Sequence, residues 1–194
     1  MAVIPPEEAL EDLDDFLSVR RSAADFRWTP ADHWHVTLAF AAQVPERAFE
    51  ELCDRLAATA QRRSAYATRI VGGGSFPHPD LARVLYAGLE GSFDDLSRAT
   101  RTAASSAGVP VDGQRFHPHL TLARLGRPVN VTRWVRLLDS YAGLPWSVTE
   151  LALVESHLGE GPRRRPRYEV RATFPLAAER AAQPHLRCED VRGE

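Results

Sequence analysis

The pentapeptide pattern His-x-Thr-Leu-Ala occurs twice in this chain, at residues 35–39 and again at residues 119–123. On a β-strand, side chains two positions apart point to the same face, so each copy presents an imidazole and a hydroxyl together. The apolar residues between them then face a core. A repeat of this kind predicts two related halves that bring their copies together across a shared groove.

The hydrophobic periodicity around the two copies predicts an α+β fold. We expect two pseudo-symmetric lobes, each an antiparallel sheet with outer helices, which face each other across a central groove. Residues 1–176 form one bilobed domain with internal repeats at about 1–90 and 91–176, and residues 177–194 form a mobile tail. The expected helices are 6–19, 45–61, 93–107 and 134–141, and the expected strands are 2–4, 35–40, 66–71, 83–89, 119–124, 147–157 and 168–174.

Two glycine- and proline-rich stretches punctuate the middle of the first half. Gly72-Gly73-Gly74 and Pro77-His78-Pro79 separate the strands expected at 66–71 and 83–89. Glycine and proline are the strongest local signals for turns and loops. The sequence therefore predicts a hairpin with a long loop, in which the glycines lie outside the strands.

Composition limits the kinds of ligand and the cellular location. The formal charge is −2 and 44% of the residues are hydrophobic, so a basic nucleic-acid tail and a disordered chain are both excluded. All cationic side chains are arginine, which leaves no lysine for a Schiff base or a P-loop. Cys53 and Cys188 are too few for a disulfide framework, and no apolar run is long enough to span a membrane. We expect a cytoplasmic monomer that does not contact membranes.

The residues of the two motifs suit acid–base chemistry on a phosphate. Imidazoles titrate near neutrality, so His35 and His119 can divide the roles of general acid and general base. The hydroxyls of Thr37 and Thr121 can hold non-bridging phosphate oxygens. Arg124 can add positive charge near the transition state, although its spacing from His119 places it on the opposite strand face unless the strand twists or ends there.

Longer segments around these motifs resemble the bacterial RNA 2′,3′-cyclic phosphodiesterases, historically called 2′-5′ RNA ligases, of the two-histidine phosphoesterase superfamily. The resemblance covers about residues 2–176, although the first strand is shorter than is usual in the family and Ala41-Ala42 replaces a common leucine–glycine pair. The most specific segment is Phe-His-Pro-His-Leu-Thr-Leu-Ala-Arg. The other similar segments are Arg27-Trp28-Thr29-Pro30, residues 153–158 and residues 168–170.

The resemblance implies an enzyme that needs no cofactor or metal and hydrolyses RNA 2′,3′-cyclic phosphate ends, or a cyclic nucleotide, to a 2′-phosphate. It implies that His35 is the general acid at the ribose 3′ oxygen and that His119 is the base that activates water. Thr37, Thr121 and Arg124 would bind the phosphate.

Several other side chains are candidates for RNA contacts. Trp28, Phe116 and Tyr168 could stack on bases, because single-stranded RNA is often bound by aromatic side chains. The arginines at 163–165 and Arg167 could contact the backbone, or form a solvated hairpin tip. Trp34 is expected to pack in the core.

Three alternative functions stay open at the level of sequence. His33 and His117 lie two residues before the motif histidines, so four imidazoles could bind Zn or Cu. The substrate could instead be a cyclic nucleotide, ADP-ribose 1″,2″-cyclic phosphate or a 2′-5′ oligonucleotide. The chain could also be a non-catalytic RNA-binding module, although both histidines and both threonines are intact.

Overall fold

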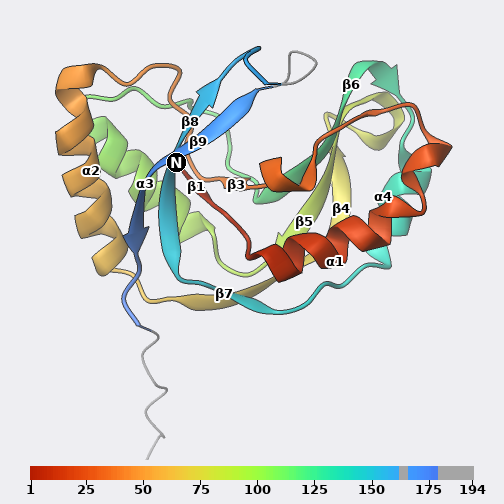
Figure 1. Cartoon of the computed structure of the whole chain (residues 1–194), viewed down its shortest axis with the longest axis horizontal. Coiled ribbons are helices and arrows are strands. Elements are labelled where there is room, and N and C mark those ends of the chain that lie inside the picture. Colours follow the sequence, from red (N-terminus) through yellow and green to blue (C-terminus); the bar gives the residue numbers. More distant parts are fainter. Residues whose placement is uncertain (162–165, 179–194) are drawn as a thin grey trace, which may run out of the picture.

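A computed structural model of the chain describes residues 1–161 and 166–178. Within these ranges the fold is α+β, as the sequence predicts, and it has four α-helices and a nine-stranded antiparallel sheet (Figure 1). The helices are α1 (Glu7–Ser18), α2 (Glu46–Gln61), α3 (Asp94–Ser106) and α4 (Thr132–Asp139). The strands are β1 (Ala2–Val3), β2 (Arg27–Trp28), β3 (Val36–Thr37), β4 (Tyr66–Phe76), β5 (Ala82–Glu90), β6 (His119–Val129), β7 (Trp146–Val148), β8 (Glu150–His157) and β9 (Arg167–Pro175).

The strands are joined into one hydrogen-bonded path in the order β7-β4-β5-β6-β3-β1-β8-β9, and β2 adds to β6. From the sequence we expected a separate sheet in each lobe. The short strands β1 and β3 instead bridge the two lobes, because β3 pairs with β6 on one side and with β1 on the other. The bridge therefore carries the first motif.

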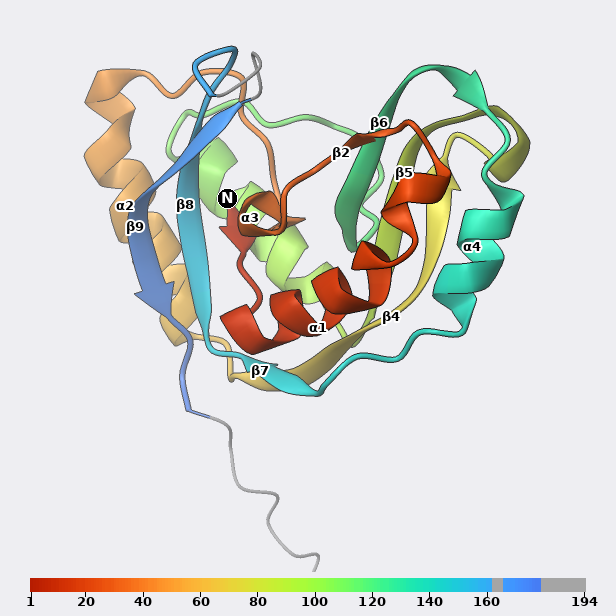
Figure 2. The same ribbon diagram turned by 45° about the vertical axis from the view of Figure 1, so that its right-hand side comes forward.

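The two lobes draw their elements from both halves of the sequence (Figure 2). Helix α2 from the first half packs against α3 from the second, and it also contacts β8 and β9. In the other lobe, α4 from the second half and α1 from the first both pack on β4. The sequence repeats thus interleave in space, whereas the predicted lobes were consecutive stretches of chain.

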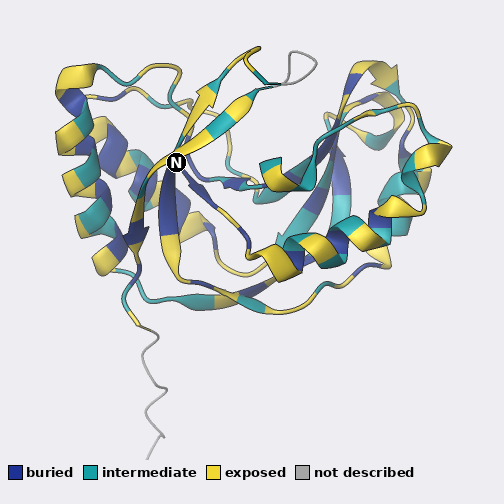
Figure 3. Ribbon diagram, viewed as in Figure 1, coloured by how far each residue is buried: buried dark blue, intermediate teal, exposed yellow. Residues whose placement is uncertain are grey.

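The helices bury some of their residues and expose others (Figure 3). Helix α2 buries Ala48, Leu52, Leu56 and Ala60, which recur every four residues and so form a single apolar stripe. Helix α1 follows Pro5-Pro6 and has two glutamates in its first turn, where negative charge interacts favourably with the helix dipole. Trp34 is only 1% exposed, which confirms its expected place in the core.

The strand expected at 147–157 is in fact two strands with different partners. Val148 in β7 pairs with Tyr66 of β4, while Glu150 in β8 pairs with Pro175 of β9. The chain therefore crosses from one lobe to the other at Thr149. The alternation is interrupted at this point, because Thr149 and Glu150 are both exposed between the buried Val148 and Leu151.

The glycine run at residues 72–74 lies inside β4 and does not end it, contrary to the sequence prediction. Gly72 has a φ of 62°, and the β4–β5 register shifts between Ile70 and Gly73. A Cβ on Gly74 would lie 2.5 Å from Cζ of Tyr86, so the glycine leaves room for that ring. The run therefore makes a bulge and a close approach within a strand.

The chain that follows β9 is anchored to the segment that follows α2. Ala177 accepts a hydrogen bond from the Ala65 amide and donates one to the Arg63 carbonyl, so the expected tail is held at its first residue. The rest of the expected tail, from residue 179 onward, lies outside the described residues. Among the described residues, no helix has the length and apolar character needed to cross a bilayer.

We predict that Gly74→Ala destabilises the protein by about 1–3 kcal/mol, because the new methyl group overpacks against the Tyr86 ring. Gly126→Ala in β6 is the matched control, since its Cβ would meet nothing within 4 Å. Denaturant unfolding of both variants measures the difference. Equal stabilities for the two variants would contradict the close approach.

Candidate active site

The two motifs lie side by side because β3 and β6 pair antiparallel, with Val36 opposite Leu120. Continuing this register by one residue in each direction places His35 opposite Thr121 and Thr37 opposite His119. Directly opposed side chains on one sheet face have Cβ atoms about 4.5–5.5 Å apart, and diagonal pairs are about 7–8 Å apart. Each imidazole is therefore the neighbour of the other motif's hydroxyl, and the two imidazoles are diagonal to each other.

Both motif imidazoles are held by the same local hydrogen bond. Nδ1 of His35 lies 2.9 Å from the carbonyl oxygen of His33, and Nδ1 of His119 lies 2.7 Å from that of His117. Because a carbonyl can only accept, Nδ1 carries the proton in both rings. Nε2 is the nitrogen left for chemistry at each site.

Burial shifts the titration of both histidines in the same direction. The pKa of His35 is lowered from 6.5 to about 4, mainly by loss of solvation. The hydrogen bond to the His33 carbonyl acts against this shift, while the nearby N-terminal amine, His33 and His119 contribute to it. Burial also lowers the pKa of His119, with smaller contributions from His117 and Arg124. Protonation is therefore disfavoured at both imidazoles.

A β-bulge turns Arg124 toward the motif residues. Between β5 and β6, Leu85 pairs with Ala123 and Tyr86 pairs with Thr121, so Leu122 is an extra residue in β6. Consistent with this, Leu122 and Ala123 are both fully buried, which breaks the alternation. The bulge reverses the facing of later residues. Arg124 consequently lines the same groove as His119 and Thr121, which the simple strand spacing did not predict.

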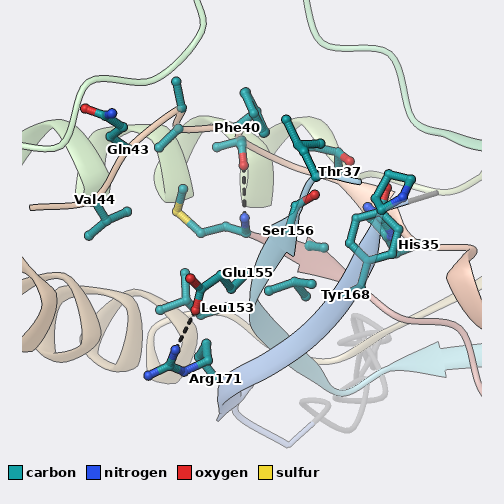
Figure 4. Close-up of a pocket in the computed structure, with 18 of the residues that line it drawn as sticks. His35, Thr37, Phe40, Gln43, Val44, Leu153, Glu155, Ser156, Tyr168 and Arg171 are labelled. Atoms are coloured by element: carbon teal, nitrogen blue, oxygen red, sulfur yellow. Dashed lines mark hydrogen bonds and ion pairs between the residues drawn. The ribbon is translucent and has the colours of Figure 1, made fainter. Parts of the chain in front are cut away.

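The groove that contains both motifs encloses about 1640 Å³. His35, Thr37, His119, Thr121 and Arg124 all line it, so the structure brings together every predicted catalytic and phosphate-binding residue. Figure 4 shows the part near His35 and Thr37, with Ser156 and Tyr168 beside them and Phe40, Gln43 and Val44 beyond. The far part is bordered by an ion pair between Arg171 and Glu155 at 2.5 Å.

Aromatic rings pack against the histidines of both motifs. The Tyr168 ring lies 5.1 Å from the His33 ring and 5.0 Å from the His35 ring, edge to face in both cases. Phe76 and Tyr86 lie 5.1 and 5.3 Å from the His119 ring, and both also contact His117. Phe76 and Tyr86 were not predicted from the sequence, because only the pairing of β4, β5 and β6 brings them to the second motif.

The three aromatic residues proposed for RNA contacts occupy different places. Tyr168 lines the groove. Trp28 packs 5.0 Å from Trp134 and is not among the described residues that line the groove. Phe116 lines a separate pocket of about 460 Å³ with Arg115.

The arginine-rich hairpin is described only in part. Residues 163–165 lie outside the described residues. Arg167 is within ion-pairing distance of Glu160 at 3.1 Å and of Glu169 at 3.0 Å. Arg167 is therefore engaged with carboxylates of its own hairpin.

The described residues do not form a metal site from the four histidines. No group of three or more histidine, cysteine, aspartate or glutamate side chains in this part of the chain is arranged to hold a metal ion. The Nδ1 atoms of His35 and His119 are occupied by backbone carbonyls. The four-histidine alternative thus lacks the convergence of ligands that it requires.

Comparisons with known proteins agree with this geometry. A family model described as the 2′-5′ RNA ligase superfamily matches residues 5–160. A protein of Geobacillus stearothermophilus, named RNA 2′,3′-cyclic phosphodiesterase, is 30% identical over 91% of this chain, which spans only 56% of that relative. A protein of Aeropyrum pernix with the same name is 30% identical over 80% of this chain and 91% of its own length.

The fold has a close counterpart among solved structures. The crystal structure of TT0787 of Thermus thermophilus superimposes with a TM-score of 0.75 at 28% identity, over 92% of this chain and 97% of that one. The family match covers most of the chain, and the structure pairs the two motifs in one groove. The chain belongs to the 2′-5′ RNA ligase superfamily of two-histidine phosphoesterases.

Proposed function

We propose that this protein is an RNA 2′,3′-cyclic phosphodiesterase that hydrolyses cyclic phosphate ends to 2′-phosphates without a metal or cofactor. The observation that carries this proposal is the β3–β6 register, which sets two Nδ1-anchored imidazoles diagonally across one groove. Two relatives of the chain are named for this activity.

The arrangement fits an in-line displacement at phosphorus. One neutral imidazole takes a proton from water, and the water oxygen bonds to phosphorus. The bond from phosphorus to the ribose 3′ oxygen breaks, and the protonated imidazole gives that oxygen its proton, which leaves the phosphate on the 2′ oxygen. Because the attacking and leaving oxygens lie on opposite sides of phosphorus, acid and base must flank it, as diagonal neighbours do.

The threonines and the arginine supply the electrostatic part of the mechanism. Thr37 and Thr121 lie on the groove face between the imidazoles and can donate hydrogen bonds to the non-bridging oxygens. Arg124 adds a permanent positive charge beside them. Donors held in place before the reaction stabilise developing negative charge without reorganisation.

The order of the acid and base roles depends on the bound phosphate. Burial disfavours the protonated form of both imidazoles. The order implied by the family resemblance, with His35 as the acid, therefore requires the phosphate anion to raise the pKa of His35. An anion bound between the rings acts in that direction.

We predict that an RNA ending in a 2′,3′-cyclic phosphate is converted to the 2′-phosphate in excess EDTA. The chemistry above needs only side chains, and the 3′ oxygen is the leaving group. Chromatography of the product against both phosphate isomers measures the outcome. Loss of activity in EDTA that Zn restores would refute metal independence, and a 3′-phosphate product would reverse the leaving oxygen.

We predict that His35→Ala and His119→Ala each lower the turnover of this RNA by about 10²–10⁴-fold, because each removes a proton-transfer group. The double variant should fall by less than the product of the two effects, since both act on one transition state. His33→Ala and His117→Ala are matched controls and should fall less than about tenfold. Equal, complete loss in all four variants would indicate metal ligands instead.

We predict a bell-shaped dependence of kcat/KM on pH with its maximum between about pH 4 and 6.5. The pKa of each motif histidine is below the ordinary 6.5, and that of His35 is about 4. Above this window both imidazoles are neutral and the acid is lost, and below it both are protonated and the base is lost. Initial rates at low substrate concentration measure the profile. A kcat/KM that still rises at pH 8 would contradict the lowered pKa values.

A further inference from the structure

The first motif has an aromatic neighbour that comes from the opposite end of the chain. Tyr168 lies in β9, opposite Ser156 of β8, and its ring stands edge to face against both His33 and His35 (Figure 4). The second motif has the same arrangement, with Phe76 and Tyr86 against His117 and His119. In both motifs, aromatic carbon therefore packs on the motif imidazole and on the imidazole two residues before it.

We propose that Tyr168 is a positioning residue, whose ring fixes the His35 imidazole so that Nε2 faces the groove, instead of serving as a platform for an RNA base. This inference rests on the proposed two-histidine hydrolysis. A hydrogen bond from Nδ1 fixes one point of a ring and leaves it free to tilt about that bond. A second contact from the side prevents this tilting. An acid–base group needs such a fixed orientation.

Several observations favour positioning over base stacking. The ring of Tyr168 already makes two edge-to-face contacts at about 5 Å, so part of its surface is covered by protein. Its strand is joined to β8 by the ion pair of Arg171 with Glu155 and to the connecting segment by that of Arg167 with Glu160. The equivalent ring contacts at the second motif come from two other strands, β4 and β5. Aromatic packing on the histidine therefore occurs at both motifs and is not peculiar to the β8–β9 hairpin.

The same contact explains part of the environment of His35. The charged or titratable groups that act on this imidazole are His33, His119 and the N-terminal amine, and all three disfavour its protonation. Loss of solvation is the largest cause of its lowered pKa. Tyr168 is one of the groups that exclude water from the ring, so a smaller side chain at this position should let the pKa rise toward 6.5.

The test compares two variants. Tyr168→Phe keeps the aromatic ring, whereas Tyr168→Leu replaces the ring with an apolar side chain that is not aromatic. Val170→Ala is the control for strand β9, since Val170 is 50% exposed and is not among the described groove-lining residues. Each variant is assayed with 2′,3′-cyclic AMP and with glycerol 1,2-cyclic phosphate. The second compound has the same reacting ring and no base.

Positioning predicts that Tyr168→Leu lowers kcat for both compounds by about 10- to 100-fold, with little change in KM, because the imidazole is misplaced. The low-pH limb of kcat/KM should move up from about pH 4, while Tyr168→Phe and Val170→Ala stay close to wild type. A loss that is confined to 2′,3′-cyclic AMP and expressed in KM would overturn the proposal and assign Tyr168 to the base.

A second readout does not depend on turnover. If wild type hydrolyses neither compound nor an RNA with a 2′,3′-cyclic phosphate end, the proposed function fails, and NMR titration of the histidine rings still tests the contact. Positioning then predicts that Tyr168→Leu raises the pKa of His35 and leaves that of His119 in place. An unchanged pKa of His35 in the Leu variant would overturn the inference.

Discussion

The candidate site depends on the pairing of two strands, the two-residue β3 and the start of β6. This short ladder, with Val36 opposite Leu120, joins the lobes and sets the two motifs in register. A slip of one residue would turn every side chain of one motif to the other face of the sheet. The buried side chains Val36, Leu38, Leu120 and Leu122 resist such a slip, because it would expose them to water.

The sequence was sufficient for those parts of the site that obey strand periodicity. His35 with Thr37, and His119 with Thr121, were predicted from two-residue spacing, and the structure places all four in one groove. Arg124 shows where that reasoning ends. Its access to the groove depends on the bulge at Leu122, and a bulge is visible only in the register with β5. Phe76 and Tyr86 escaped prediction for a related reason, since their contacts join strands distant in sequence.

For the fold, too, features that depend on neighbouring residues could be predicted from the sequence, whereas features that depend on distant residues could not. The apolar stripe of α2 and the alternation around both motifs are local, and the predicted helices are present within two residues of their expected bounds. The strands follow less closely, because β4 and β6 extend beyond their expected ends and the strand expected at 147–157 is divided. The interleaving of the lobes and the change of partner at Thr149 are long-range. The glycines at 72–74 were predicted to form a loop because glycine favours turns. In the structure they lie within β4, where the absence of side chains makes room for Leu138 and Tyr86.

The central claim is that His35 and His119 act together on one phosphorus atom. The most direct measurement is a crystal structure of the complex with uridine vanadate, whose trigonal-bipyramidal vanadium mimics the five-coordinate phosphorus of an in-line displacement. We expect Nε2 of each histidine to lie within hydrogen-bonding distance of a different apical oxygen, with Thr37 and Thr121 on equatorial oxygens. A vanadate that contacts only one of the histidines, or that binds outside the groove, would contradict the claim.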